Sequence, residues 1–210
     1  MHSANGHVTS QPKKNGAHKK PAFVMDIEAA APEAESKSLR HMEPTGREVS
    51  FGQEELIVSK TDLNGRITYA NDVFCRVSGF SQSEVVGQPH SFIRHPDMPR
   101  CIFKMLWDAI QSGKEIYAYV VNLTKNGDAY WVLAHVTPTV DEHGAITGYH
   151  SNRRFPDRHQ VAKVKALYER LMAAERGHAR KADAIAASSQ LLESIVAETH
   201  KSYEEFSLSI

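Results

Sequence analysis

The chain has 210 residues, which is enough for one ordinary domain with tails or for two small domains. Its 25 Lys and Arg residues balance 25 Asp and Glu residues, so charge gives no reason to expect a nucleic acid or an anionic membrane as partner. No apolar run approaches the roughly 20 residues that cross a bilayer, the N-terminus is unlike a secretory signal, and two cysteines without a CxxC pair suit a reducing compartment. We therefore expect a cytoplasmic protein without direct membrane insertion.

Residues 1–50 are expected to form a mostly disordered tail. The opening MHSANGHVTSQPKKNGAHKKPA contains almost no large apolar side chains, so it cannot bury enough surface to offset the entropy of ordering. A short helix within FVMDIEAAAPEAESKSLR would be broken at Pro32.

Residues 51–155 change in character and begin with two predicted strands. ELIVSKTD and RITYAN are rich in β-forming residues, and Asn64–Gly65 between them is typical of a tight turn. The following DVFCRVSGF predicts a short helix that Asp72 can cap and Gly79 ends. A second helical turn follows in SQSEVVGQ, which opens with a capping-box pattern.

A longer helix and three more strands complete this region. RCIFKMLWDAIQSGK has helical periodicity and stops at Gly113. EIYAYVVNLTK, DAYWVLAHVTPTVD and ITGYHSNRRF read as strands, with turns at Asn126–Gly127 and His143–Gly144. Two strands, several short helices and three strands predict an α+β domain, with a five-stranded antiparallel sheet, helices on one face and ligand space between the two layers.

Residues 156–210 are predicted to form a C-terminal helix with a coiled-coil-like seam. The seam is weak in the middle, at Gly177, His178 and Lys181. Its residues recur at alternating steps of three and four, with Lys181 occupying one step: Val164, Leu167, Leu171, Ala174, His178, Lys181, Ile185, Ser188, Leu192 and Ile195. The first turns could pack on their own domain, but beyond residue 180 a helix–helix partner is favoured. This region would then act in signalling or dimerisation, as a homodimer or in a helix-mediated complex.

The stretch RHPDMP, residues 94–99, places charged side chains on a stiff corner. Its two prolines fix the backbone and exclude the middle of a helix. Arg94 offers a planar fork suited to phosphate or carboxylate oxygens, and Asp97 could hold Arg94 or His95 in place. On the residues alone, a surface Arg94–Asp97 salt bridge that closes a turn is the favoured reading, and an anion site is the alternative.

The middle region resembles a PAS domain, and more narrowly the flavin-binding PAS domain of Aer-type aerotaxis and energy-taxis receptors. The matching pieces are TYANDVF, VSGF, GQPHSFIRHPDMP, LW, KNGDAYWV and GY, and the resemblance covers about 100 residues. It implies a PAS fold over residues 51–155, non-covalent FAD, and a cytoplasmic redox or oxygen sensor that signals to a chemoreceptor or another chemotaxis-type partner.

The resemblance also implies a set of cofactor-binding residues. Arg94, His95 and Asp97 match the RHPD group that the family needs for FAD binding. Asn71, Trp107 and Asn122 fall at positions that line the flavin pocket, and Trp131 matches the tryptophan of YWV. The chain departs from the pattern at His135, on the strand where flavin-binding relatives often carry Asn against the pyrimidine edge. An imidazole there would still make one hydrogen bond.

Two other functions remain open at this point. A haem-binding PAS gas sensor would need one axial histidine, for which His95 or His135 would serve. A cofactor-free PAS module would dimerise or scaffold a receptor partner. The histidines show no metal-site spacing, the NCRF-like cysteine motif of LOV photoreceptors is absent, and no catalytic signature is found, so we do not expect an enzyme.

Overall fold

The computed structural model of the chain describes residues 42–210. Most of the predicted tail, residues 1–41, lies outside the described residues. Residues 42–50 belonged to the predicted tail as well, but they lie along the turn between the third and fourth strands. Thr45 N–H donates to the carbonyl of Gly127 at 2.9 Å, and Val49 N–H donates to the carbonyl of Ala129 at 2.8 Å. The folded domain therefore begins earlier than residue 51.

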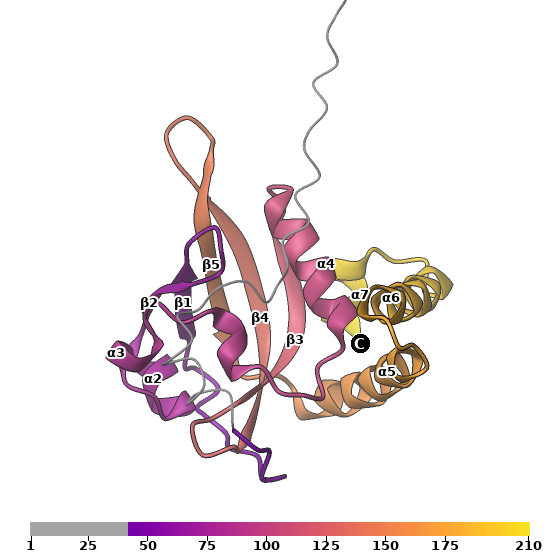
Figure 1. The fold of residues 1–210 in the computed structure, drawn as a ribbon, viewed down its shortest axis with the longest axis horizontal. Coiled ribbons are helices and arrows are strands. Elements are labelled where there is room, and N and C mark those ends of the chain that lie inside the picture. The colour runs from indigo at the N-terminus through magenta and orange to yellow at the C-terminus, as the bar shows by residue number, and fades with distance from the viewer. Residues whose placement is uncertain (1–41) are drawn as a thin grey trace, which may run out of the picture. The chain divides into compact units, whose positions relative to one another are not determined.

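The centre of the domain is a five-stranded antiparallel sheet, shown in Figure 1. The strands follow the order β2-β1-β5-β4-β3, so β3 lies at one edge and β2 at the other. Their bounds are Ile57–Thr61 for β1, Ile67–Ala70 for β2, Ile116–Leu123 for β3, Ala129–Val140 for β4 and Ile146–Arg154 for β5. The predicted fold class is confirmed: an α+β PAS-type fold with a five-stranded antiparallel sheet and short helices on one face.

Short helices lie between β2 and β3 in the chain and cover one face of the sheet (Figure 1). Their bounds are Asp72–Ser78 for α2, Gln82–Val85 for α3, His90–Ile93 for the 3₁₀ helix η1 and Arg100–Gln111 for α4. The predicted capping box of Ser81 and Glu84 is present, and Gly79 adopts the left-handed conformation that ends α2. Asn71 caps α2 in place of the predicted Asp72, since its side chain accepts from Phe74 N–H.

Strand register decides which side chains share a face of the sheet, because side chains alternate along a strand and directly paired residues point to the same side. Arg153 on β5 pairs with Ile57 on β1 and with Ala134 on β4. The Arg153 guanidinium lies 5.9 Å from the ring centroid of Phe74 on α2, so Arg153 points toward the helices. We call this side of the sheet the inner face and the other side the outer face.

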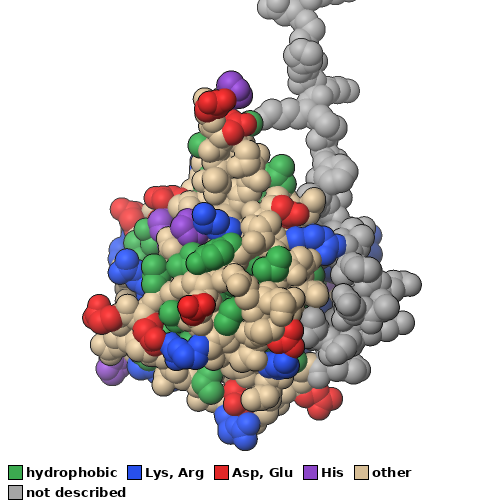
Figure 2. Space-filling view, turned by 90° about the vertical axis from the view of Figure 1, so that its left-hand side faces the viewer, with side chains coloured by type: hydrophobic (Ala, Val, Ile, Leu, Met, Phe, Trp, Pro, Cys, Tyr) green, Lys and Arg blue, Asp and Glu red, His purple; other side chains and the backbone are tan. Residues whose placement is uncertain are grey.

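The β4–β5 hairpin extends beyond the other strands (Figure 1). Its turn consists of exposed residues that include Asp141, Glu142 and His143, and Figure 2 shows acidic and histidine side chains at this protruding tip. Charged side chains on a projecting hairpin oppose edge-to-edge pairing with another sheet.

The C-terminal region forms three helices where the sequence predicted one. They are α5 (Arg158–Arg176), α6 (Lys181–Glu198) and α7 (Tyr203–Ser209), and they lie on the β3 side of the sheet in Figure 1. Gly177 ends α5, and α6 then packs against α5 and α4. The break falls at Gly177 and His178, where the predicted seam has no large apolar residue. Among residues 42–210, no helix has both the length and the apolar character that a bilayer crossing requires.

The predicted seam is buried within the same chain. Its fully or nearly buried members are Val164, Leu167, Leu171, Ser188 and Leu192. Within the described residues, the helices that α6 packs against are therefore α5 and α4 of the same chain.

Candidate functional site

Two arginines, Arg94 and Arg153, lie between the sheet and its helices. Arg153 is 4% exposed, and Nε of Arg94, the residue that ends η1, is buried as well. Among residues 42–210, the ion pairs involve neither guanidinium. Burial lowers the pKa of each arginine to about 10, which leaves both charged at neutral pH. The interior therefore holds positive charge that the described residues do not neutralise.

Arg153 is held by two inner-face neighbours. Its Nη2 donates to Ser59 Oγ at 3.0 Å and to His90 Nε2 at 2.6 Å. Burial, together with the charges of Arg153 and Arg94, lowers the pKa of His90 well below its usual value. His90 is therefore neutral and accepts through Nε2, which places its own proton on Nδ1.

Several buried polar atoms of this region have no hydrogen-bond partner within the described part of the chain. They include Arg94 Nε, Arg153 Nη1, Asn122 Nδ2 and Ser151 Oγ. Asn122 and Ser151 are 3% and 7% exposed, and backbone pairing joins Arg94 to Asn122. Because an unpaired buried donor costs about 1–3 kcal/mol, and more when it is charged, this set fits a ligand that is rich in acceptor oxygens and negatively charged.

Aromatic rings from the helices face the two guanidiniums. Arg94 lies 3.6 Å above the ring centroid of Phe103 on α4, and Phe74 packs edge-on against the His90 ring at 6.2 Å. A ring face attracts a desolvated cation and offsets part of its lost hydration. The site thus combines cationic donors with flat apolar surfaces.

The other charged members of the RHPD group, His95 and Asp97, contact each other, as the sequence allowed. The side chain of Asp97 is 71% exposed, and its N–H donates to His95 Nδ1 at 3.1 Å, so this pair forms the turn. Asp97 does not hold Arg94, and the favoured Arg94–Asp97 salt bridge is not formed. His95 is 8% exposed, and burial lowers its pKa although the Asp97 charge opposes the change.

Asn71 and Trp107 are occupied by contacts within the protein. Asn71 Oδ1 accepts from the N–H groups of Val58 and Phe74, and its Nδ2 donates to the carbonyl of Leu56. Every polar group of this side chain is therefore already used to join β1 to α2. Trp107 packs edge-on against Tyr149 at 5.5 Å, four residues before Arg153 on β5.

Trp131 and His135 lie on the outer face, away from this site. Trp131 packs against Tyr168 of α5 with ring centroids 6.0 Å apart. His135 stacks on Tyr117 at 4.2 Å, and its Nε2 lies 2.9 Å from Glu115 Oε2. Strand parity places His135 on the outer face: Tyr130 pairs with Asn122 on the inner face, and His135 lies five positions further along β4, which is an odd offset.

Sequence reasoning missed Ser59, His90, Ser151 and Arg153. A signal existed in ITGYHSNRRF, where alternate residues of one strand include Ser151 and Arg153 beside the apolar Tyr149. Polar residues on a face that should be buried indicate a site. Among residues 42–210, no cluster of three or more His, Cys, Asp and Glu side chains is arranged to hold a metal ion.

Comparison with known proteins agrees with this fold. Residues 67–153 match the family model described as PAS fold. The chain is 41% identical to the aerotaxis receptor of Escherichia coli (strain K12) over 133 residues, which are 63% of this chain and 26% of that protein. It is 27% identical to a nitrogen fixation regulatory protein of Klebsiella pneumoniae over 130 residues, 62% of this chain and 26% of that protein.

The matched part of the chain spans about a quarter of the length of these relatives. The aligned 133 residues exceed the 67–153 range of the family match and so include sequence beyond the sheet and its short helices. Residues 67–153 therefore match the PAS fold, and the longer aligned part of the chain is similar to the aerotaxis receptor of Escherichia coli.

Proposed function

We propose that this chain is a cytoplasmic redox or oxygen sensor of the energy-taxis kind, not an enzyme, and that it binds FAD non-covalently between the inner face of the sheet and helices α2–α4. The observation that carries the proposal is the pair of guanidiniums, Arg94 and Arg153, which have no carboxylate partner among residues 42–210. Similarity to the aerotaxis receptor of Escherichia coli supports the sensing role.

The cost of these charges separates a cofactor site from a scaffold. An ion that is buried without a partner costs several kcal/mol, and apolar side chains often replace buried charges with no loss of stability. A cofactor-free dimerisation module would gain nothing from Arg94 and Arg153 in its interior. A dinucleotide supplies two phosphates and further acceptor oxygens, which would satisfy both guanidiniums.

Each residue of the site has a role toward such a ligand. Arg94 and Arg153 would donate to anionic or carbonyl oxygens, and Asn122 and Ser151 would supply neutral hydrogen bonds. His90 keeps Arg153 oriented because it accepts from Nη2 and leaves Nη1 free. When it is bound, FAD supplies a ring system that takes up and releases electrons.

The signal would pass to the C-terminal helices and then to a chemotaxis-type partner, either in a homodimer or in a helix-mediated complex. Asn122 lies on β3, the edge strand that contacts α7, so one strand carries a residue of the site and also contacts the C-terminal region. Sedimentation equilibrium with and without FAD would show whether binding changes the association state.

Neighbouring arginines on β5 provide a matched test of the FAD site. Arg153 points inward, whereas Arg154 is exposed on the outer face. We expect Arg153→Gln to weaken FAD binding at least about tenfold, since a charge-assisted hydrogen bond is lost, and Arg154→Gln to leave it unchanged. Fluorescence titration with FAD gives both values. Equal affinity in both variants, or no binding by the wild-type chain, would contradict the proposal.

A further inference from the structure

Helix α4 begins without a cap from its own segment. Pro99 occupies the N-cap position and offers no side-chain hydrogen bond. Glu175, near the end of α5, supplies the cap instead: its Oε1 accepts from Arg100 N–H at 2.7 Å and from Cys101 N–H at 3.4 Å. Glu175 is 8% exposed. A carboxylate at a helix N-terminus is stabilised by the free N–H groups and by the helix dipole.

The same carboxylate oxygen also joins α6. Ser188 Oγ lies 3.0 Å from Glu175 Oε1, within hydrogen-bond distance, and Ser188 is completely buried. One oxygen atom is thus the point where three helices meet: the start of α4, the end of α5 and the middle of α6. Because it is shielded from water, this hydrogen bond is electrostatically stronger than the same bond would be at the surface.

The turn that Glu175 caps directly continues the segment 94–99. This segment runs along the free edge of β3, where His95 N–H donates to the carbonyl of Val121 at 3.4 Å and Val121 N–H donates to Met98 Sδ at 3.4 Å. At its start, Arg94 pairs with Asn122. The candidate site and the cap are therefore the two ends of one short, proline-stiffened segment.

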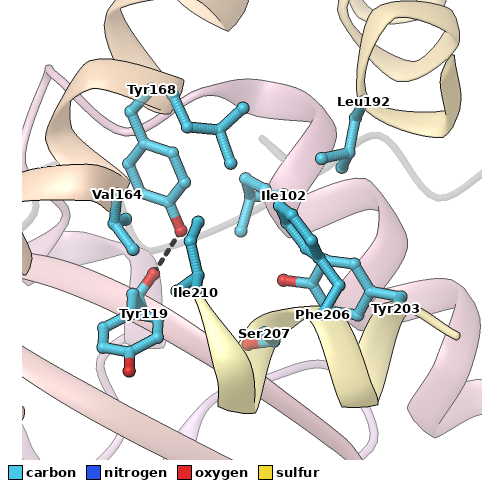
Figure 3. A pocket seen from close by; sticks show the side chains of 10 residues that line it. Ile102, Tyr119, Val164, Tyr168, Leu192, Tyr203, Phe206, Ser207 and Ile210 are labelled. Atoms are coloured by element: carbon cyan, nitrogen blue, oxygen red, sulfur yellow. Dashed lines mark hydrogen bonds between the residues drawn. The ribbon is translucent and has the colours of Figure 1, made fainter. Parts of the chain in front are cut away.

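The C-terminal helices use the next carbonyl groups of the same strand edge. Tyr168 Oη donates to the carbonyl of Tyr119 at 2.5 Å, as Figure 3 shows, and Ser207 Oγ donates to the carbonyl of Tyr117 at 3.3 Å. Side chains from α4 to α7 and β3 line the pocket in that view, among them Ile102 and Leu192. Segment 94–99 and the C-terminal helices thus share the edge of β3.

We propose that Glu175 is a positioning residue that latches the α5–α6 hairpin to the first turn of α4, so that docking of the hairpin depends on where segment 94–99 places that turn. This proposal gives a second connection between the candidate site and the C-terminal helices. It runs from Arg94 through α4, whereas the first is the direct continuation of β5 into α5. The identity of the ligand that would move the segment, FAD, rests on the proposed function. The contact of Glu175 with α4 and α6 needs no ligand.

Hydrogen exchange measured by mass spectrometry on the full chain tests the latch. The variants are Glu175→Ala, the conservative Glu175→Gln, and Glu169→Ala as a control on the exposed side of α5. Without FAD, we expect the α5–α6 amides of Glu175→Ala to exchange about tenfold faster than those of the wild type. Glu175→Gln should show a smaller increase because an amide oxygen can still accept, and Glu169→Ala should show none.

The measurement is repeated with FAD. Binding should slow exchange in segment 94–99 of every variant, but in α5–α6 only where the latch is intact. Equal α5–α6 exchange in Glu175→Ala and Glu169→Ala without FAD would overturn the latch. An equal effect of FAD on α5–α6 exchange in these two variants would also overturn the latch. If FAD binds to none of the proteins, the proposed function fails, and the comparison without FAD alone decides the latch.

Discussion

Nη2 of Arg153 lies 2.6 Å from Nε2 of His90, so a buried cation donates to a neutral imidazole. This pair fixes the protonation state of both residues, because a second positive charge on His90 would face Arg153 at hydrogen-bond distance. It also makes the interior sensitive to pH in a defined direction.

The free energy of unfolding should fall as the pH drops below about 6.5, the usual histidine pKa. Because the pKa of His90 is lowered in the folded state, the unfolded chain binds more protons below that value, and stability then rises with pH. One such proton corresponds to a slope of about 1.4 kcal/mol per pH unit. Urea unfolding from pH 5 to pH 8 should show this slope reduced in His90→Gln and retained in His143→Gln, whose histidine is exposed in the β4–β5 turn. An unchanged slope in His90→Gln would show that His90 is not held neutral.

Asn122 and His135 test which face of the sheet carries the site. Asn122→Ala should weaken FAD binding several-fold, since a buried amide donor on the inner face is removed. His135→Ala should leave the affinity unchanged, because its imidazole stacks on Tyr117 on the outer face. Isothermal titration calorimetry compares the two variants. The reverse order of effects would mean that the ligand lies on the outer face.

Gly65 supports Trp107 from the β1–β2 turn. A Cβ at this position would lie 2.9 Å from the indole ring, and the residue has φ +75°, a backbone conformation that favours glycine. Gly65→Ala should therefore lower the free energy of unfolding by about 1–3 kcal/mol. Gly144→Ala separates the two causes, because Gly144 has φ +78° with nothing within 4 Å. Equal losses in urea unfolding would assign the whole effect to the backbone.

Tyr168 closes part of the β3 edge, and its hydroxyl is the donor to a buried carbonyl. Tyr168→Phe leaves the carbonyl of Tyr119 without that partner, so we expect a loss of about 1–3 kcal/mol in the free energy of unfolding. Tyr69→Phe is the control, since Tyr69 is 42% exposed. If the two variants are equally stable, the hydrogen bond from Tyr168 to the edge of β3 contributes nothing to the free energy of unfolding.

Local patterns predicted most of the fold. Alternating residues and glycine turns placed all five strands, and the capping box of Ser81 with Glu84 placed the start of α3. These signals depend only on residues that are close together in the chain, so they can be recognised in a single sequence. The weak middle of the predicted seam coincides with the helix break at Gly177. The packing of α6 against α4 could not be predicted in this way, because it depends on contacts between residues far apart in the chain.

The candidate site was predicted in part for the same reason. Arg94 and Asn122 matched family motifs and lie together, whereas His135 matched by strand and lies on the outer face, away from them. The alternation along β5 marks Arg153 only as a buried polar residue, and Glu175 has no local signal, so the sequence does not show the role of either residue. Each acquires it only when the fold brings it to a partner, His90 in one case and the start of α4 in the other.

The absorbance spectrum of the purified full chain, followed by identification of any released ligand, tests the central claim most directly. We expect the spectrum of oxidised flavin, a released ligand that phosphodiesterase converts from FAD to FMN, and loss of the colour in Arg94→Ala and Arg153→Gln but not in Arg154→Gln. A colourless wild-type chain that also fails to take up added FAD, or a haem spectrum in place of a flavin spectrum, would contradict the account.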